Sequence, residues 1–569
     1  MRGRLRIESS TLALVGLGAL LVFTAVVVLH ETRGTTLWTD EWGWALDRRS
    51  GSLLEPHNGH FSLIPLLLYR ALFATAGMTD YLPYRVMVVI GHLTVATLLF
   101  IYARRRIGPI AALLPTAVLL TLGPAWQNFL WPFQIAWLIS LAAGLVALLA
   151  LDHGDRRGEI VASAALAVAL ASSGVGVAVA AGLVVDVLGR RRPVWIVAAP
   201  IALYLLWWLV YQDTDFWRHN VVVAPQFAAD AAGGAVATVL GLTEGRLDEN
   251  GGLVDAGAAL VWGRPLIIVA GLVVIWRLAG LRTVPLRVLA LLASAAAFWL
   301  LGGLQRAQIS SPDASRYLYV GAVFVLLIAV ELLRGVRVGR EIALLAVVLT
   351  GLIVVANLGD LRAGARNLRQ QAVISRADLG ALELARKDIK PGYDAARFPG
   401  IPFVQIDAER YFAAAKALGS PALSLAELPG ASEHGRLAVD AELANIEEIV
   451  PKPSRAAPGS TPPQIDVVTG GQVATDGGCV RFTPDPVAPA GAVPELQVTV
   501  PAEGLLMTAE GGPAGFALRR FAATFPVEPT ARLAPGGSSE LRPGDDPATQ
   551  PWHVRLKPEA GVRVCGLRP

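Results

Sequence analysis

Apolar runs of about 20 residues recur between residues 10 and 357, and they restrict the fold more than any other feature. As an α-helix, such a run crosses the hydrocarbon core of a bilayer with its backbone polar groups satisfied internally. The composition agrees, because 54% of the 569 residues are hydrophobic and 17% are charged. Soluble domains carry about 25% charged residues. The sequence therefore predicts a polytopic α-helical membrane protein.

The arginines between the apolar runs set the direction of the predicted spans. The eleven predicted spans are 10–30, 82–103, 108–124, 134–151, 159–172, 174–189, 194–211, 256–277, 285–303, 316–334 and 341–357. With these boundaries every arginine cluster falls on one side, which the positive-inside rule makes cytoplasmic. We therefore predict a multi-pass protein of the cell (plasma) membrane, with a cytoplasmic N-terminus, an uncleaved first span and an extracytoplasmic C-terminal region.

Three further segments bear on this count. Residues 61–77 are apolar but short, and counting them as a span would place the later arginine clusters outside. We expect an interfacial helix there, with Tyr69 and Arg70 toward water. Residues 226–243 are expected to form a second surface helix or a plain connector. Residues 159–189 are expected to form a hairpin of two helices, with one long helix as the alternative.

Beyond residue 360 the composition becomes polar, and three regions are predicted. Residues 361–450 form a helical extracytoplasmic connector, and the Pro/Ser-rich stretch 451–463 is a linker. Short alternating segments in 464–569 predict a β-sandwich. Cys479 and Cys565 are expected in its first and last strands, where either a disulfide or two free buried thiols fits.

The loop after the first span contains the most distinctive polar residues. Its sequence, TTLWTDEWGWALDRRSGSLLEPHNGH, places Asp40 and Glu41 among tryptophans on the predicted outer side. A carboxylate there can act as a general base that takes a proton from an attacking hydroxyl. The alternative is an acidic cap on a helix that starts at Thr39 or Asp40. From these residues alone both interpretations stay open.

Other polar and aromatic residues are predicted to gather on the same side. His57 and His60 are either two ligands of a divalent metal or hydrogen-bonding residues at a helix start. Further candidates for substrate binding share large aromatic or polar side chains; they are Trp38, Trp42, Trp126, Gln127, Trp131, Gln134 and Asp215. The segment RYLY offers Arg316 and Tyr317, and Arg306 lies nearby. These arginines either bind a phosphate or pair with Asp40 or Asp313.

Several classes of site are not indicated. The sequence contains no zinc pattern, phosphate-binding loop, dinucleotide fingerprint or nucleophile elbow. The isoelectric point near 9.1 reflects arginines in short loops between spans, so it does not indicate a nucleic-acid partner.

The chain resembles the GT-C superfamily of glycosyltransferases, which are polytopic enzymes that use polyprenyl-phosphate sugars. The likeness rests on the acidic pair in WTDEW, the interfacial helix at 61–77, the segment SRYLY that opens a late span, and the soluble outer domain. The composition and the sandwich also resemble actinobacterial cell-wall arabinofuranosyl- and mannosyltransferases, whose outer domains look like carbohydrate-binding modules. Those enzymes often have two adjacent aspartates where this chain has Asp-Glu.

This resemblance implies a mechanism and partners. The resemblance implies that a polyprenyl-phosphate sugar, with arabinofuranose or mannose as the transferred unit, is held through its phosphate by Arg316, with Arg306 as a second candidate. Asp40 deprotonates a hydroxyl of a cell-envelope glycan, which attacks with inversion, while Glu41 orients the acceptor or shares the role of base. The family includes metal-dependent and metal-independent members, so the resemblance fixes no cofactor.

Two other classes of function compete with this one. A transporter or flippase of lipid-linked glycan predicts ionisable residues deep within spans, but Asp186 and Glu331 lie toward the predicted cytoplasmic ends. A non-catalytic scaffold that binds envelope glycan predicts that Asp40 can be replaced without loss of function.

Overall fold

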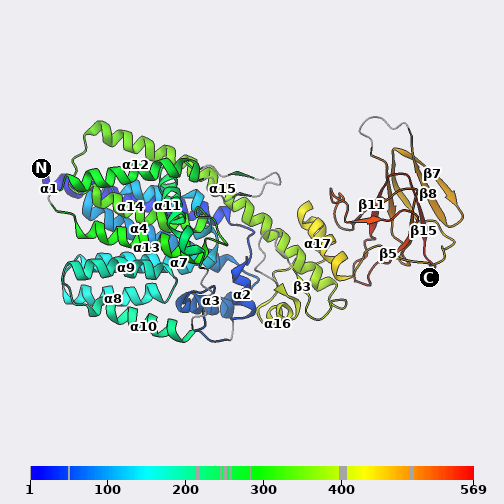
Figure 1. The fold of residues 1–569 in the computed structure, drawn as a ribbon, viewed down its shortest axis with the longest axis horizontal. Coiled ribbons are helices and arrows are strands. Elements are labelled where there is room, and N and C mark those ends of the chain that lie inside the picture. Colours follow the sequence, from blue (N-terminus) through cyan, green and yellow to red (C-terminus); the bar gives the residue numbers. More distant parts are fainter. Residues whose placement is uncertain are drawn as a thin grey trace. The chain divides into compact units, whose positions relative to one another are not determined.

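The computed structural model describes residues 2–48, 51–211, 218–243, 246–247, 253–254, 259–281, 283–395, 406–486 and 493–568. They form two compact units, residues 1–369 and 370–569. The first unit is a bundle whose main helices lie side by side, and the second combines helices with a β-sandwich (Figure 1). The predicted class, a helical membrane protein with a β-rich C-terminal region, is confirmed.

Within the described ranges, eight helices are long and apolar enough to cross a membrane. They are α1 (Arg2–Glu31), α4 (Leu82–Ile107), η2 (Pro132–Gln134) continued by α7 (Ile135–Leu151), α11 (Asn220–Val239), α12 (Leu260–Ala279), α13 (Leu286–Arg306), α14 (Ser315–Leu332) and α15 (Arg340–Leu384). The shorter helices of the bundle are α2 (Asp40–Leu46), α3 (Leu63–Ala76), α5 (Leu113–Leu120), α8 (Arg156–Leu170), α9 (Val175–Gly189) and α10 (Trp195–Tyr211). Two antiparallel strands of two residues each, β1 (Arg246–Leu247) and β2 (Leu253–Val254), precede α12. The chain is a multi-pass membrane protein.

The arginine-rich loops meet at one end of the bundle, which we call the arginine end. Arg106, at the end of α4, contacts Glu331 of α14 and lies 3.1 Å from Asp152, which follows α7. Arg287 of α13 lies 2.9 Å from Asp152 and 3.7 Å from Asp186 of α9. These pairs tie five helices together, and they show that loops far apart in sequence share one end. That this end faces the cytoplasm stays a prediction.

The predicted hairpin over residues 159–189 is confirmed. Helix α8 ends at Leu170 and α9 begins at Val175, which excludes one long helix. Gly176 permits the tight return, because a Cβ there would lie 2.4 Å from the carbonyl oxygen of Ala169.

The prediction of a single helical span over 108–124 is wrong. Only α5 is helical there, and its eight residues cover about 12 Å of a hydrocarbon core roughly 30 Å thick. From Thr121 the chain continues through η1 (Gly123–Ala125), α6 (Gln127–Leu130) and η2 (Pro132–Gln134). Prolines open η1 and η2, and proline cannot continue an α-helix. The irregular segment is almost wholly buried, as non-helical backbone at membrane depth must be.

Helix α11 begins earlier than predicted and is packed into the bundle rather than lying over it. The Asn220 side chain donates to the carbonyl of Leu304 at 2.8 Å. The rings of Phe227 and Tyr317 lie 6.2 Å apart. These partners belong to the ends of α13 and α14 that lie away from the arginine end. Most of the second half of α11 is buried against α12, α13 and α14.

The second unit begins within α15 and continues with a helical part. It contains β3 (Asp394–Ala395), β4 (Ile406–Asp407), α16 (Ala408–Leu418), η3 (Leu428–Gly430) and α17 (Glu433–Ile446). Helix α16 lies within residues 361–450, which were predicted to be helical. Asp407 caps it by accepting from the backbone N–H of Arg410 at 2.8 Å.

Two antiparallel sheets form the sandwich that follows. One has the strand order β5-β13-β10-β15-β8-β7, and the other β12-β11-β14-β9-β6. The strands are β5 (Lys452–Pro453), β6 (Ile465–Thr469), β7 (Gly471–Asp476), β8 (Cys479–Pro484), β9 (Glu495–Thr499), β10 (Leu505–Glu510), β11 (Ala514–Arg519), β12 (Ala531–Leu533), β13 (Ser538–Leu541), β14 (His553–Pro558) and β15 (Gly561–Gly566).

A disulfide joins Cys479 and Cys565, which are opposite each other on β8 and β15. The placement of Cys479 in the first strand of the sandwich is wrong, because β6 and β7 precede β8. The predicted linker 451–463 is also partly ordered, since β5 pairs with β13. Part of the predicted linker is therefore an edge strand of one sheet rather than an unpaired segment.

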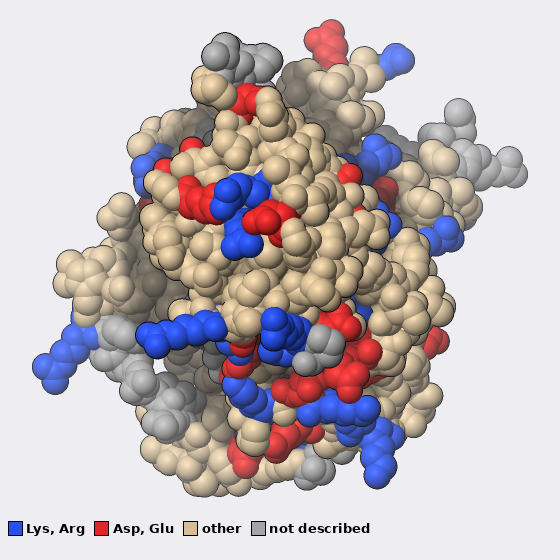
Figure 2. Space-filling model, turned by 90° about the vertical axis from the view of Figure 1, so that its right-hand side faces the viewer, with Lys and Arg blue, Asp and Glu red and all other residues tan. Residues whose placement is uncertain are grey.

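The sandwich places several aromatic side chains inside. Phe482, Phe516, Phe525 and Trp552 are all buried, so none of these four offers a ring on which a sugar could stack. On the face drawn in Figure 2, acidic and basic side chains lie interleaved. The expected likeness to a carbohydrate-binding module thus gains no aromatic platform from these residues.

Candidate active site

Helix α2 carries both candidate carboxylates and lies in the loop between α1 and α3. It begins at Asp40, so Asp40 and Glu41 occupy its first turn, where negative charge suits the helix dipole. Thr39, just before the helix, makes no side-chain capping bond. The side chains of Asp40 and Glu41 have different surroundings.

Glu41 is fully buried and accepts four hydrogen bonds. Its Oε1 accepts from the hydroxyl of Tyr69 at 2.5 Å. Its Oε2 accepts from the hydroxyl of Tyr81 at 2.7 Å, from the backbone N–H of Trp38 at 2.9 Å and from the indole N–H of Trp131 at 3.1 Å. Burial raises the pKa of Glu41 to about 7, against these hydrogen bonds, which lower it. We call this arrangement the Glu41 cage.

The cage corrects the predicted orientation of α3. Tyr69 was expected to face water, but it is fully buried because its hydroxyl reaches Glu41. Arg70 is half-buried, and its guanidinium donates to the carbonyl of Arg48 at 2.8 Å. One side of α3 is therefore committed to holding the first loop.

Asp40 is half-buried, and one of its oxygens is held by Asn58. The Asn58 amide donates to Oδ1 at 2.8 Å. In the part of the chain that the structure describes, Oδ2 accepts no hydrogen bond, so of the two oxygens it is the candidate proton acceptor. The geometry thus separates the pair, with Asp40 open to a substrate and Glu41 enclosed.

Asn58 lies in a tight turn that brings two histidines together. His57 and His60 exchange backbone hydrogen bonds of 3.0 and 2.9 Å. The central residues Asn58 and Gly59 have φ angles of 50° and 77°, as a type I′ turn requires. The Asn-Gly pair is the preferred sequence for that turn, so this signal was available in the sequence. Asn58 contacts Asp40 and was left out of the predicted candidate site.

Arg306, at the end of α13, reaches this turn from 248 residues away in sequence. Its guanidinium donates to the carbonyl of Asn58 at 2.5 Å and lies 3.3 Å from Nε2 of His60. A guanidinium only donates, so Nε2 of His60 accepts and the ring proton resides on Nδ1. Burial and the charge of Arg306 lower the pKa of His60 to about 3. His60 is therefore a neutral acceptor at pH 7.

Arg316 lies close enough to lower the pKa of His60 as well, though less than Arg306 does. It donates to the hydroxyl of Ser310 at 3.2 Å and lies over the ring of Tyr317 at 5.3 Å. Across the described ranges, neither Arg306 nor Arg316 forms an ion pair. The expected alternative, pairing with Asp40 or Asp313, is thus not found there. Both guanidinium groups keep donors for an anion.

The predicted sugar-binding aromatic residues are mostly packed against one another. Trp38 lies 4.7 Å from Trp131 and 6.2 Å from Trp126, between ring centroids. These three and Trp42 are all buried. The rings therefore form the core beneath the loop in this structure.

The remaining predicted site residues are Gln127, Gln134, Asp215 and His57. Gln127 and Gln134 are buried, and the backbone N–H of Gln127 donates to Ser315 at 3.1 Å. Asp215 lies outside the described residues. His57 is half-buried beside Trp44 and Phe133, and burial lowers its pKa to about 4. No three His, Cys, Asp or Glu side chains converge as metal ligands within the described ranges.

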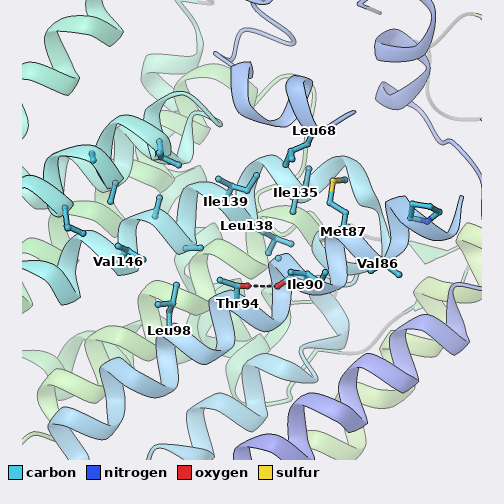
Figure 3. A pocket seen from close by; sticks show the side chains of 18 residues that line it. Leu68, Val86, Met87, Ile90, Thr94, Leu98, Ile135, Leu138, Ile139 and Val146 are labelled. Carbon is cyan, nitrogen blue, oxygen red and sulfur yellow. Dashed lines mark hydrogen bonds between the residues drawn. The ribbon is translucent and has the colours of Figure 1, made fainter. Parts of the chain in front are cut away.

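An apolar groove runs along the wall of the bundle between α3, α4, α7 and α8 (Figure 3). Its volume is about 820 Å³, and it extends from Leu68 and Pro83 to Leu98 and Val146. Among its lining residues only Thr94 has a polar side chain, and that hydroxyl is bonded to the carbonyl of Ile90 at 2.7 Å. The groove therefore suits a hydrocarbon chain.

Comparisons with known proteins give a distant likeness. The chain matches no protein-family model and no curated protein. One similar solved structure is ArnT from Cupriavidus metallidurans bound to undecaprenyl phosphate, with 14% identity, coverage of 71% of this chain and 85% of that chain, and a TM-score of 0.42. The structure of ArnT from the same organism in the apo state has 15% sequence identity and a TM-score of 0.41, and the match covers 67% of this chain and 81% of that chain. At these values the chemistry has to be inferred from the chain's own residues.

Proposed function

We propose that this protein is a membrane glycosyltransferase that moves a sugar from a polyprenyl-phosphate donor to a hydroxyl of a cell-envelope glycan, with Asp40 as the general base. One observation carries the proposal. Asp40 is half-buried and linked through Asn58 to Arg306, so the proposed proton acceptor and the proposed anion-binding group both contact the turn at Asn58.

The chemistry of Asp40 follows from its hydrogen bonding. Asn58 holds Oδ1 and thereby orients the carboxylate, which leaves Oδ2 to accept a proton. The acceptor hydroxyl loses its proton to Oδ2 as its oxygen bonds to the anomeric carbon. The bond from that carbon to the phosphate oxygen breaks on the opposite face, so the configuration is inverted.

The arginines serve the leaving group. Polyprenyl phosphate departs as a stable anion, so no general acid is needed at the phosphate oxygen. Arg306 and Arg316 supply guanidinium donors, and because His60 beside them is neutral, the positive charge at this place comes from the two arginines. This is the electrostatic stabilisation that a transferring phosphate ester requires.

The groove supports a lipid-linked donor. The rise of α4 from Pro83 to Leu98 corresponds to about 22 Å of helix, enough for several isoprene units. Its Leu68 end adjoins the cage, because the next residue, Tyr69, bonds Glu41. We assign the groove to the polyprenyl chain, and the resemblance to GT-C enzymes favours arabinofuranose or mannose as the sugar. On the same resemblance we propose that the reaction takes place on the outer face of the membrane.

Transport receives no comparable support. Asp186 and Glu331 both pair with arginines at the arginine end, so these two carboxylates do not lie free along a pathway between the helices.

A transfer assay tests the proposal. Native membranes and the purified protein are supplied with a panel of radiolabelled polyprenyl-phosphate sugars and envelope glycan. We expect transfer from at least one donor and loss of transfer in Asp40→Asn. Asp47→Asn is the matched control, since Asp47 is exposed and immediately follows the same helix. Full activity of Asp40→Asn would overturn Asp40 as the base.

A further inference from the structure

We propose that Glu41 is a positioning residue whose carboxylate fixes helix α2 and thereby the direction in which Asp40 faces. The inference rests on the proposed role of Asp40 as the base. It assigns to the second member of the acidic pair a task that differs from proton transfer or substrate contact.

The first support is the origin of the four donors. Trp38 precedes α2, Tyr69 belongs to α3, Tyr81 immediately precedes α4, and Trp131 lies between α6 and η2. All four direct a polar hydrogen at one carboxylate. Glu41 is thus the point at which four parts of the chain, up to 90 residues from it in sequence, are joined.

The second support is the size of α2. The helix has seven residues, and isolated helices shorter than about 12 residues are marginal in water. Its orientation must therefore come from side-chain contacts. Consecutive residues of an α-helix point about 100° apart, so any rotation that releases Glu41 from its cage also turns Asp40 away from Asn58.

The third support is chemical. The backbone N–H of Trp38 and the indole N–H of Trp131 can only donate, so Oε2 of Glu41 accepts from both whether or not the carboxyl group carries a proton on Oε1. Both oxygens of Glu41 are already used, and the side chain is fully buried. A substrate hydroxyl has no access to it unless the cage opens, whereas Asp40 is half-exposed.

Conservative substitutions separate positioning from direct catalysis. In Glu41→Gln the amide oxygen can replace Oε2 and keep its three donors. The amide nitrogen then donates to the hydroxyl of Tyr69, which can turn to accept. Tyr69→Phe and Tyr81→Phe each remove one bond to Glu41. Tyr84→Phe is the matched control, because the Tyr84 hydroxyl bonds the carbonyl of Gly77 instead.

The experiment uses the purified full chain and measures kcat, donor KM, the pH–rate profile and the amount of donor bound per mole of protein. We expect Glu41→Gln to keep kcat within a few fold of wild type. The double variant Tyr69→Phe/Tyr81→Phe should lose at least tenfold in kcat, with unchanged donor stoichiometry and KM and a shifted acid limb. Tyr84→Phe should match wild type.

Two results would overturn the inference. One is a Glu41→Gln enzyme as inactive as Asp40→Asn while still binding donor in full, which would make Glu41 a catalytic residue. The other is a double Phe variant with wild-type kcat and pH profile, which would make the cage irrelevant to Asp40. Failure of the proposed function is recognised separately, by full activity of Asp40→Asn in the same assay.

Discussion

Asp40 and Glu41 are neighbours in sequence but lie in opposite environments. Glu41 is fully buried and accepts four hydrogen bonds, whereas Asp40 is only half-buried and is held on one oxygen by Asn58. Under the proposed function, the two carboxylates divide the tasks of anchoring and reacting. Four measurements test consequences of this division and of the surrounding site.

Asn58→Gly should lower kcat about tenfold or more, since a hydrogen bond to a charged group is worth about 1.5–3 kcal/mol. Glycine accepts the φ of 50° that the turn needs, so the fold should be retained and the loss confined to the orientation of Asp40. Steady-state kinetics check this, with a thermal melt to verify folding. An unchanged kcat would remove Asn58 from the site.

Arg316→Ala should raise the donor KM about tenfold, because one guanidinium no longer contacts the phosphate. Arg264→Ala is the matched control, since Arg264 is exposed and pairs with Asp230 at 2.8 Å. Donor titration in detergent micelles measures both variants. Equal KM values in the two variants would argue against a phosphate role for Arg316.

The pH dependence of stability should carry a contribution from Glu41. Its pKa in the fold, about 7, lies above the ordinary value of 4.5. Between these pH values the folded chain retains a proton that the unfolded chain has released. The contribution is therefore fully present below pH 4.5 and is lost as the pH rises to 7. It amounts to roughly 3 kcal/mol.

Melting temperatures of wild type and Glu41→Gln, measured from pH 4.5 to 7.5, isolate this contribution. The difference, wild type minus variant, should fall as the pH rises. A difference that stays constant across the range would mean that Glu41 does not titrate in it.

Ala142→Trp should obstruct the groove and raise the KM of a long-chain polyprenyl donor more than that of a short-chain analogue. Leu203→Trp is the control, because Leu203 is 67% exposed on α10 and lies outside the groove. Kinetics with both chain lengths give the readout. If both variants respond alike to the two donors, the groove does not hold the donor chain.

Much of the arrangement could be predicted because hydropathy and arginine placement are local signals. They located the loop that carries Asp40 and the helices that surround it. The burial of Glu41 could not be predicted, since it depends on Tyr69, Tyr81 and Trp131 meeting at one point. Hydrophobic periodicity does not predict which distant side chains will meet in the fold.

Two other features that the sequence analysis missed could have been predicted from local residues. The break after α5 follows from Pro124 and Pro132, which hydropathy alone does not weigh. The Asn58-Gly59 turn was also readable from its residue pair. The contact of Arg306 with Asn58 was not, because it joins elements 248 residues apart.

That long separation sets an order of assembly during synthesis. The bond from Asn58 to Asp40 joins residues 18 apart, and the cage is complete once Trp131 has emerged. Arg306 arrives only with the end of α13. Because a chain is made from its N-terminus, the residues that hold the proposed base are synthesised long before the proposed anion-binding arginines. Under the proposed function we expect a partly inserted chain, which has Asp40 but lacks the charge that retains a phosphate, to be inactive until α13 and α14 are in the membrane.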